Sequence, residues 1–146
     1  MDVKSFIINF TSRMMDVLRE LSVLQGELEK ILEGKPLTFG LDFSFNVYVS
    51  GELWWEVKSG GGNIEVYLVT YEREDGGKYA WAILEFSGSF KKAKEIEFSV
   101  ECDADKLSLC LHVHDANQLL NRLFEEFERK IGEVKNVINV LKTMCT

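Results

Sequence analysis

The sequence contains one proline, two histidines and three cysteines among its 146 residues. The cysteines, Cys102, Cys110 and Cys145, are an odd number and form no C-x-x-C pair, which argues against a disulfide framework and a zinc clip. The first residues also lack the basic leader, apolar core and cleavage site of a secretory signal. Unpaired thiols are typical of a reducing compartment, so we expect a cytoplasmic protein.

Long apolar runs and an excess of positive charge are also missing. No stretch approaches the roughly 20 apolar residues that a membrane-spanning helix needs, so we expect no membrane partner. The 17 Lys and Arg residues stand against 24 Asp and Glu residues, which gives a net charge of −7. An acidic chain lacks the clustered cations that bind phosphate backbones, so we expect no nucleic-acid partner.

Apolar residues, by contrast, are plentiful. Hydrophobic residues make up 46% of the chain and aromatic residues 12%, which excludes intrinsic disorder. A chain of this length buries roughly 70% of its unfolded surface, enough for one core. The sequence therefore predicts a single domain over residues 1–146.

Two long helices are predicted at the ends of the chain. Over residues 2–33, apolar side chains recur in alternating steps of four and three, as in a helix that packs along its whole length. Asp2 is placed to cap this helix and Gly34 to end it. The same alternation follows a second capping residue, Asp115, and continues to Cys145.

Between the helices the apolar period changes to two, which is typical of strands with one buried face. Short turns rich in Gly and Asp separate the apolar segments and favour an antiparallel meander. The predicted fold class is α+β: a six-stranded antiparallel meander between two long helices, both packed antiparallel on one face of the sheet. The six strands are expected at 37–50, 52–58, 64–73, 78–90, 94–103 and 106–114.

Strand register follows from pairing apolar residues with apolar residues, because a slip of one residue would turn a whole buried face outward. The first hairpin is expected to pair Val49 with Leu53, Val47 with Trp55 and Phe45 with Val57. The third and fourth strands are expected to pair Ile64 with Gly88, Val66 with Phe86 and Leu68 with Leu84. The last hairpin is expected to pair Asp103 with Lys106, Phe98 with Leu111, Glu97 with His112 and Glu95 with His114.

Two helices can cover only one face of such a sheet, so the other face is expected to lie open. An aromatic patch on an open face is more typical of an interface than of a monomer surface, and a two-fold dimer is the simplest way to bury it. Cross-strand pairs that stay solvated, or a sheet that curls on itself, are the alternatives. The expected partner-binding residues are Tyr48, Trp54, Tyr67, Tyr71, Trp81 and Ile83.

Few residues suggest chemistry. His112 and His114 would share a strand face with Glu95 and Glu97, a set that could hold a divalent metal, although cross-strand Glu–His pairs are ordinary on a solvated face. Cys110 lacks a readable base and oxyanion site. The glycine run at 60–62 joins two strands and lacks the following helix of a phosphate loop. We therefore predict no catalytic residue, no cofactor and no metal.

The sequence thus favours a non-enzymatic interaction module, a homodimer that binds a protein or peptide partner through the outer face of the sheet. In layout alone, a helix, a meander and a helix, the chain resembles small acidic chaperones such as the type III secretion class, although it lacks their central helix. It also loosely resembles prefoldin, although its flanking helices are shorter. The alternative is a carrier or enzyme for a small apolar ligand, with a pocket between the helices and a curved sheet. Seven inward-facing phenylalanines could line that pocket or fill the core: Phe39, Phe43, Phe45, Phe86, Phe98, Phe124 and Phe127.

Overall fold

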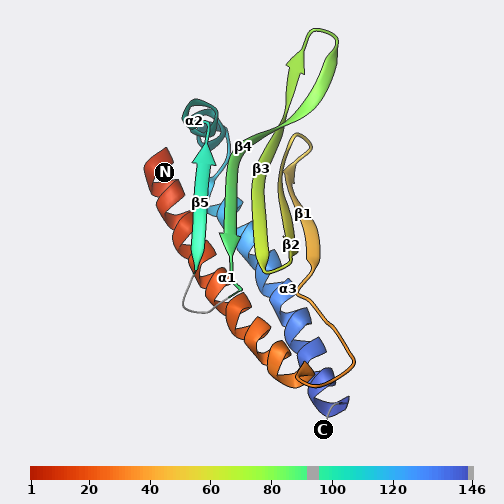
Figure 1. Ribbon diagram of the computed structural model, residues 1–146. Coiled ribbons are helices and arrows are strands. Elements are labelled where there is room, and N and C mark those ends of the chain that lie inside the picture. Colours follow the sequence, from red (N-terminus) through yellow and green to blue (C-terminus); the bar gives the residue numbers. More distant parts are fainter. Residues whose placement is uncertain (92–95, 145–146) are drawn as a thin grey trace.

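The computed structural model describes residues 1–91 and 96–144 as an α+β protein with three helices and one five-stranded antiparallel sheet (Figure 1). The strands lie in the sheet in the order in which they occur along the chain, β1-β2-β3-β4-β5. The elements are α1 (Val3–Leu32), β1 (Phe43–Ser50), β2 (Leu53–Gly60), β3 (Asn63–Glu74), β4 (Gly77–Ser89), β5 (Glu97–Cys102), α2 (Ala104–Val113) and α3 (Ala116–Met144).

Both long helices are confirmed, together with their caps. The Asp2 carboxylate accepts a hydrogen bond from the Ser5 amide at 2.7 Å, which satisfies one of the free amides at the start of α1. Asp115 does the same for the Gln118 amide at 3.1 Å ahead of α3. Past the end of α1, Gly34 adopts a φ of 71°, a left-handed conformation that suits glycine.

Most of the predicted register is confirmed. Val66 pairs with Phe86, and Val47 pairs with Trp55, as the apolar pattern requires. The first hairpin differs at its turn, where Ser50 rather than Val49 lies opposite Leu53 because the register shifts between Tyr48 and Ser50.

The first strand is shorter than the predicted range of 37–50, because β1 begins at Phe43. Leu37 and Phe39 lie before it and are exposed. Leu41 is buried, and its carbonyl oxygen accepts a hydrogen bond from the Ser59 hydroxyl at 2.8 Å. The alternating apolar pattern thus extends upstream of β1 into residues that have no neighbouring strand to pair with.

The predicted sixth strand, 106–114, is wrong: this segment lies in helix α2 and its cap. The Asp103 carboxylate accepts from the Lys106 amide at 3.1 Å and starts a helix where a turn was expected. Leu107 and Cys110, three residues apart, are the buried side chains of the helix. The predicted pairing of Phe98 with Leu111 is therefore wrong as well.

The antiparallel arrangement of the long helices is also wrong, because α1 and α3 run parallel (Figure 1). Contacts advance in the same direction along both helices: Arg13 donates to Asn121 at 2.9 Å, and further along Glu20 lies 2.7 Å from Lys135. An odd number of strands returns the chain to the end where α1 begins. A sixth strand would have brought the chain to the opposite end and reversed α3.

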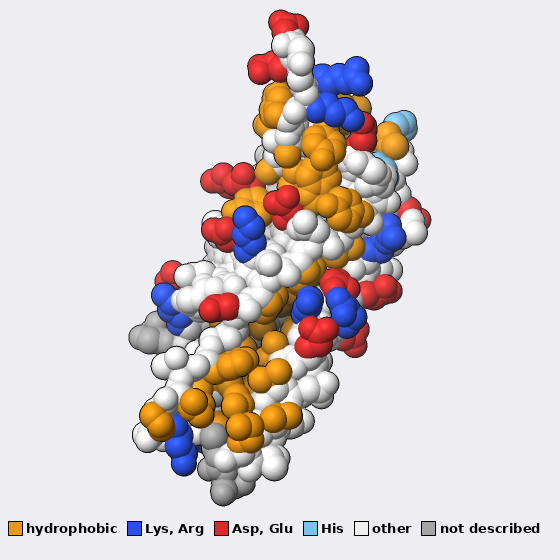
Figure 2. Space-filling view, turned by 90° about the vertical axis from the view of Figure 1, so that its right-hand side faces the viewer, with side chains coloured by type: hydrophobic (Ala, Val, Ile, Leu, Met, Phe, Trp, Pro, Cys, Tyr) orange, Lys and Arg blue, Asp and Glu red, His pale blue; other side chains and the backbone are white. Residues whose placement is uncertain are grey.

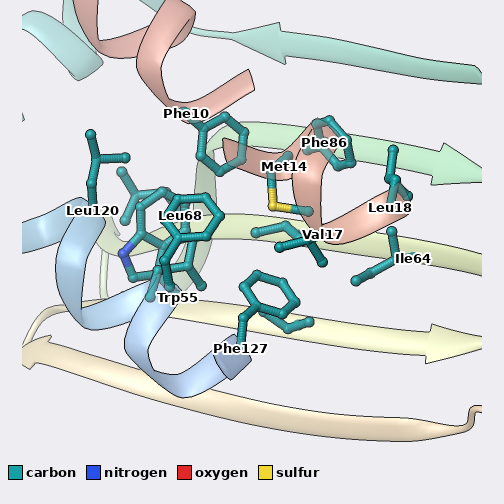
Figure 3. Close-up of a cluster of buried hydrophobic side chains, with 14 of the residues drawn as sticks. Phe10, Met14, Val17, Leu18, Trp55, Ile64, Leu68, Phe86, Leu120 and Phe127 are labelled. Carbon is teal, nitrogen blue, oxygen red and sulfur yellow. The ribbon is translucent and has the colours of Figure 1, made fainter. Parts of the chain in front are cut away.

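The core lies between the sheet and the two long helices, which pack on the same face of it (Figure 3). The Phe10 ring of α1 stacks on Trp55 at 5.5 Å and meets the edge of Phe86 at 5.7 Å. The Phe127 ring of α3 meets Phe45 at 5.2 Å. These rings belong to the buried core between the helices and the sheet.

Candidate interaction surface

The outer face of the sheet, opposite α1 and α3, is open along its outward-facing positions. Residues at one level of the sheet show this: Ser44, Lys58, Glu65, Ser87 and Ser99 follow one another across the five strands and are all exposed. Alternation fixes the assignment, since their neighbours along each strand face the helices.

An aromatic cluster lies on this outer face, formed by Tyr48, Trp54, Val69 and Tyr71. The Trp54 ring lies 6.1 Å from Tyr48 and 4.9 Å from Tyr71, measured between centroids. The two tyrosines are 60% and 43% exposed, whereas Trp54 is only 6% exposed because its neighbours flank it. The indole N–H donates to the Glu56 carboxylate at 2.9 Å. The cluster therefore presents two phenol rings to solvent around a shielded indole.

Tyr67 lies on the same face, one level below Val69 on β3. Its hydroxyl donates to the Glu65 carboxylate at 2.9 Å. Burial, followed by this hydrogen bond and nearby carboxylates, raises the pKa of Tyr67 to about 12. The phenol therefore stays neutral and tied to the acidic part of the face.

Trp81 and Ile83 were expected on the outer face, and this placement is wrong. The β3–β4 register shifts after Leu68, so Ile83 has no direct partner and the outward parity of β4 changes at that point. Trp81 and Ile83 both pack against the core, and the Lys106 ammonium of α2 lies 3.6 Å from the Trp81 ring centroid. Four of the six expected partner-binding residues thus share the outer face.

A groove of about 600 Å³ lies where α2 meets the upper ends of β2 and β3. Leu53 and Ile83 line it from the sheet, and Leu109 and Val113 line it from α2. The two α2 side chains are 67% and 75% exposed. Leu53 and Ile83 belong to the buried face of the sheet, so the groove lies on the helix side, and Tyr71 also contributes to its lining.

The β3–β4 arm, residues 71–80, extends beyond the strands on either side of it, since β2 pairs only as far as Thr70 and β5 only as far as Leu84 (Figure 1). Figure 2, which views the molecule from the β1 edge, shows hydrophobic side chains gathered below the charged tip of this arm. The apolar surface of the upper part of the molecule is therefore larger than the aromatic cluster alone.

Ion pairs fix the base of the arm on both faces. On the outer face, the Lys78 ammonium lies 2.7 Å from the Glu52 carboxylate and 5.2 Å from the Tyr71 ring centroid. On the helix side, Lys106 and Tyr79 both donate to Glu72 and hold the pKa of that carboxyl below its usual value. Lys78 thus lies beside Tyr71 at the edge of the aromatic cluster.

The predicted histidine pair does not share a strand face. His112 is exposed on α2, and the His114 amide donates to the Cys110 carbonyl at 2.9 Å as the helix ends. Without a sixth strand, the pairing of His112 with Glu97 does not form, and Glu95 lies outside the described residues. Within residues 1–91 and 96–144, no group of three or more His, Cys, Asp or Glu side chains could hold a metal ion.

The cysteines offer no activated nucleophile among the described residues. Burial raises the pKa of the Cys110 thiol to about 11, which keeps it protonated at neutral pH. Cys102 is exposed at the end of β5, and its pKa is raised by partial burial and by Asp103. Cys145 lies outside the described residues.

Comparison with family models, with curated proteins and with solved structures gives no match. In the described part of the chain, no helix is both long enough and apolar enough to cross a membrane.

Proposed function

We propose that this protein is a non-enzymatic, chaperone- or adaptor-like interaction module that binds a protein or peptide partner, including a second copy of itself, through the outer face of its sheet. The aromatic cluster carries the proposal: Tyr48 and Tyr71 stand exposed on either side of Trp54 on an uncovered face. Tyrosine and tryptophan are enriched at protein interfaces because each combines a large apolar ring with a polar group.

The surroundings of the cluster support the same function. Trp54 and Val69 are already shielded by their neighbours, so an arriving partner would gain most from the two tyrosines. Apolar surface rimmed by ion pairs is the usual composition of a protein-binding site. A reducing, cytoplasmic location fits this proposal, since Cys102 and Cys110 are free thiols.

A small apolar ligand is the second candidate, and the groove beside α2 is the observation that favours it. Its volume of about 600 Å³ lies within the range of about 300–1,000 Å³ that is common for ligand sites, and Leu53 and Ile83 give it an apolar floor. Native mass spectrometry of the purified protein separates the two candidates. A retained apolar molecule supports the carrier, whereas a bare chain or a bare dimer supports the interaction module.

Site-specific photocrosslinking tests the proposed function directly. A photoreactive phenylalanine analogue is placed at Tyr48 or at Tyr71, and crosslinks are recovered from cells of the source organism. Tyr79 is the matched control, because it is also an exposed tyrosine of the arm but its ring lies on the helix side. We expect protein adducts, with the same chain or another, from the two outer positions. No adduct from either position, or equal adducts from Tyr79, would refute the proposal.

A further inference from the structure

The outward-facing side chains of β3 are arranged symmetrically about Val69. Tyrosines lie two residues away on each side, at Tyr67 and Tyr71, and opposite charges lie four residues away, at Glu65 and Arg73. All five side chains alternate onto the outer face. When the strand is read in the opposite direction, the two tyrosines still lie at equivalent positions about Val69. The negative charge of Glu65 and the positive charge of Arg73 exchange places.

Neighbouring strands extend the charge pattern across the face. Arg73 pairs across the ladder with Lys78, so two cations lie on the arm. At the other end of the face, Glu65 and Glu85 are exposed, and Glu85 lies directly opposite another carboxylate, Glu101 of β5. Lys58, beside Glu65 on β2, is a cation within this acidic half. Within the strands, apart from Lys58, the cations lie on one side of the aromatic cluster and these carboxylates on the other, while Glu52 of the β1–β2 turn pairs with Lys78 on the cationic side.

A second copy of the chain can meet this face about either of two perpendicular two-fold axes. If the axis ran along β3, each residue would meet the same level of the partner, and Glu65 would face Glu65 of the partner subunit. Two like charges that face each other across an interface oppose association. If the axis crosses β3 at Val69, the partner strand is reversed, and Arg73 faces Glu65 of the partner subunit while Tyr71 faces Tyr67 of the partner subunit.

We propose that two copies of this chain form a face-to-face dimer whose two-fold axis crosses β3 at Val69, with Arg73 of each copy paired with Glu65 of the other. This inference rests on the proposed function, since it names the partner of the outer face. Tyr48 and Trp54 pair across β1 and β2, and Trp54 pairs with Val69, so these residues lie in one row along the axis. The aromatic cluster of one copy therefore packs on that of the other.

The size of the face fits such a dimer. Four strands at about 4.8 Å spacing, over the length of residues 65–73, give a flat footprint of roughly 600 Å² on each copy. Protruding tyrosine rings add accessible area toward the ~800 Å² per partner of a standard interface. An apolar centre with charged pairs at its rim is the usual anatomy of an interface. Among the described residues, Arg73 forms no ion pair within its own chain, although its charge, after that of Lys78, lowers the pKa of the Glu52 carboxyl.

Charge reversal tests this geometry by sedimentation velocity over a wide range of protein concentrations. The proposed contact occurs twice in the dimer, so either R73E or E65R creates two repulsive pairs. We expect each single variant to raise the dissociation constant roughly 10- to 100-fold, and the double variant R73E/E65R to recover most of the affinity. The control is K58E, a reversal at the level of Glu65 on β2, where the proposed partner places no cation in the same column; it should not weaken the dimer. Circular dichroism confirms that each variant is folded.

The outcomes separate this inference from the proposed function. Weakening by both single variants together with recovery in the double variant supports the proposed axis. A native chain that stays monomeric overturns the dimer, although crosslinks from Tyr71 to a different protein would leave the proposed function standing. A dimer that Tyr71→Ser weakens, but that the double variant does not restore, overturns the axis and keeps the face. A dimer that Tyr71→Ser leaves unchanged lies elsewhere and overturns the inference.

Discussion

Replacing Phe10 by alanine tests whether the aromatic rings between α1 and the sheet form the stabilising centre of the fold. The Phe10 side chain is completely buried and contacts three other rings, those of Trp55, Phe86 and Phe124, with centroids 5.5, 5.7 and 6.3 Å away. It is therefore the point at which α1, the sheet and α3 meet. Its removal leaves a cavity that neither the sheet nor α3 can close without moving.

The expected loss follows from this burial. Removing a fully buried phenylalanine side chain from its apolar surroundings costs about 1.5–3 kcal/mol, and the aromatic contacts add about 1 kcal/mol. With the cavity included, we expect Phe10→Ala to lower the free energy of unfolding by about 4 kcal/mol, within the usual range for this change. Such a loss is a large part of the total stability of about 5–15 kcal/mol of a typical domain.

Urea denaturation followed by tryptophan fluorescence and by circular dichroism measures this loss. For a slope of about 2 kcal/mol per molar urea, the midpoint should fall by about 2 M. The matched control is Phe98→Ala, the same change at a ring that is 43% exposed and stacks on Phe86 at 5.9 Å. We expect it to cost about 1 kcal/mol. A loss below about 1.5 kcal/mol for Phe10→Ala, or one no larger than that of Phe98→Ala, would refute this account of the core.

Two further predictions concern a tight packing contact at Gly88 and the titration of the Tyr67 phenol. Gly88→Ala should lower the free energy of unfolding by about 1–2 kcal/mol in thermal or urea denaturation, because the added methyl would meet the Leu18 side chain at 3.0 Å. The same change at Gly26, in α1, meets nothing within 4 Å and should raise stability by about 0.5–1 kcal/mol through helix propensity. An alkaline ultraviolet titration should show the Tyr67 phenol ionising near pH 12, later than an ordinary tyrosine. Because folding raises this pKa, the stabilisation is present below about pH 10 and is lost as the pH rises toward 12. Disappearance of the late step in Tyr67→Phe would assign it, and an unchanged titration curve would contradict it.

The parts of the fold with one strong periodic signal could be predicted from the sequence. The long helices have an uninterrupted apolar seam and a capping aspartate, and the pairing of Val66 with Phe86 follows from matching apolar faces. In both cases the burial of apolar side chains and the local conformational preference favour the same structure, so few alternative structures compete with it.

The prediction of a sixth strand was wrong because the same residues fit both the strand period of two and the helical period. Leu107, Leu109, Leu111 and Val113 alternate as in a strand, but Leu107 and Cys110 also have helical spacing. Asp103 was the available signal, since its carboxylate caps α2. The wrong number of strands also gave α3 the wrong direction, because the number of strands decides the end of the sheet at which the last helix starts.

The placement of Trp81 and Ile83 could not be predicted because the sequence does not alternate there. Residues 80–84 are all apolar, so either parity places only apolar side chains on the buried face. The bulge in the β3–β4 pairing, which leaves Ile83 without a partner on β3, decides between them. The cations of the arm, Arg73 and Lys78, carry no sequence signal of a binding role, because a charged turn resembles ordinary solvated surface.

The parallel course of α1 and α3 also has an electrical consequence. Antiparallel neighbours cancel their backbone dipoles, whereas these two helices add them, so both amino-terminal ends lie at the α2 end of the molecule (Figure 1). Each helix contributes about half a unit of charge at each terminus, so the backbone alone places about one positive unit at that end and one negative unit at the other. Ion pairs between the helices, Glu20 with Lys135 and Glu27 with Lys142, oppose the resulting repulsion between equal ends. The backbone thus gives the molecule a lengthwise polarity in addition to its net negative charge.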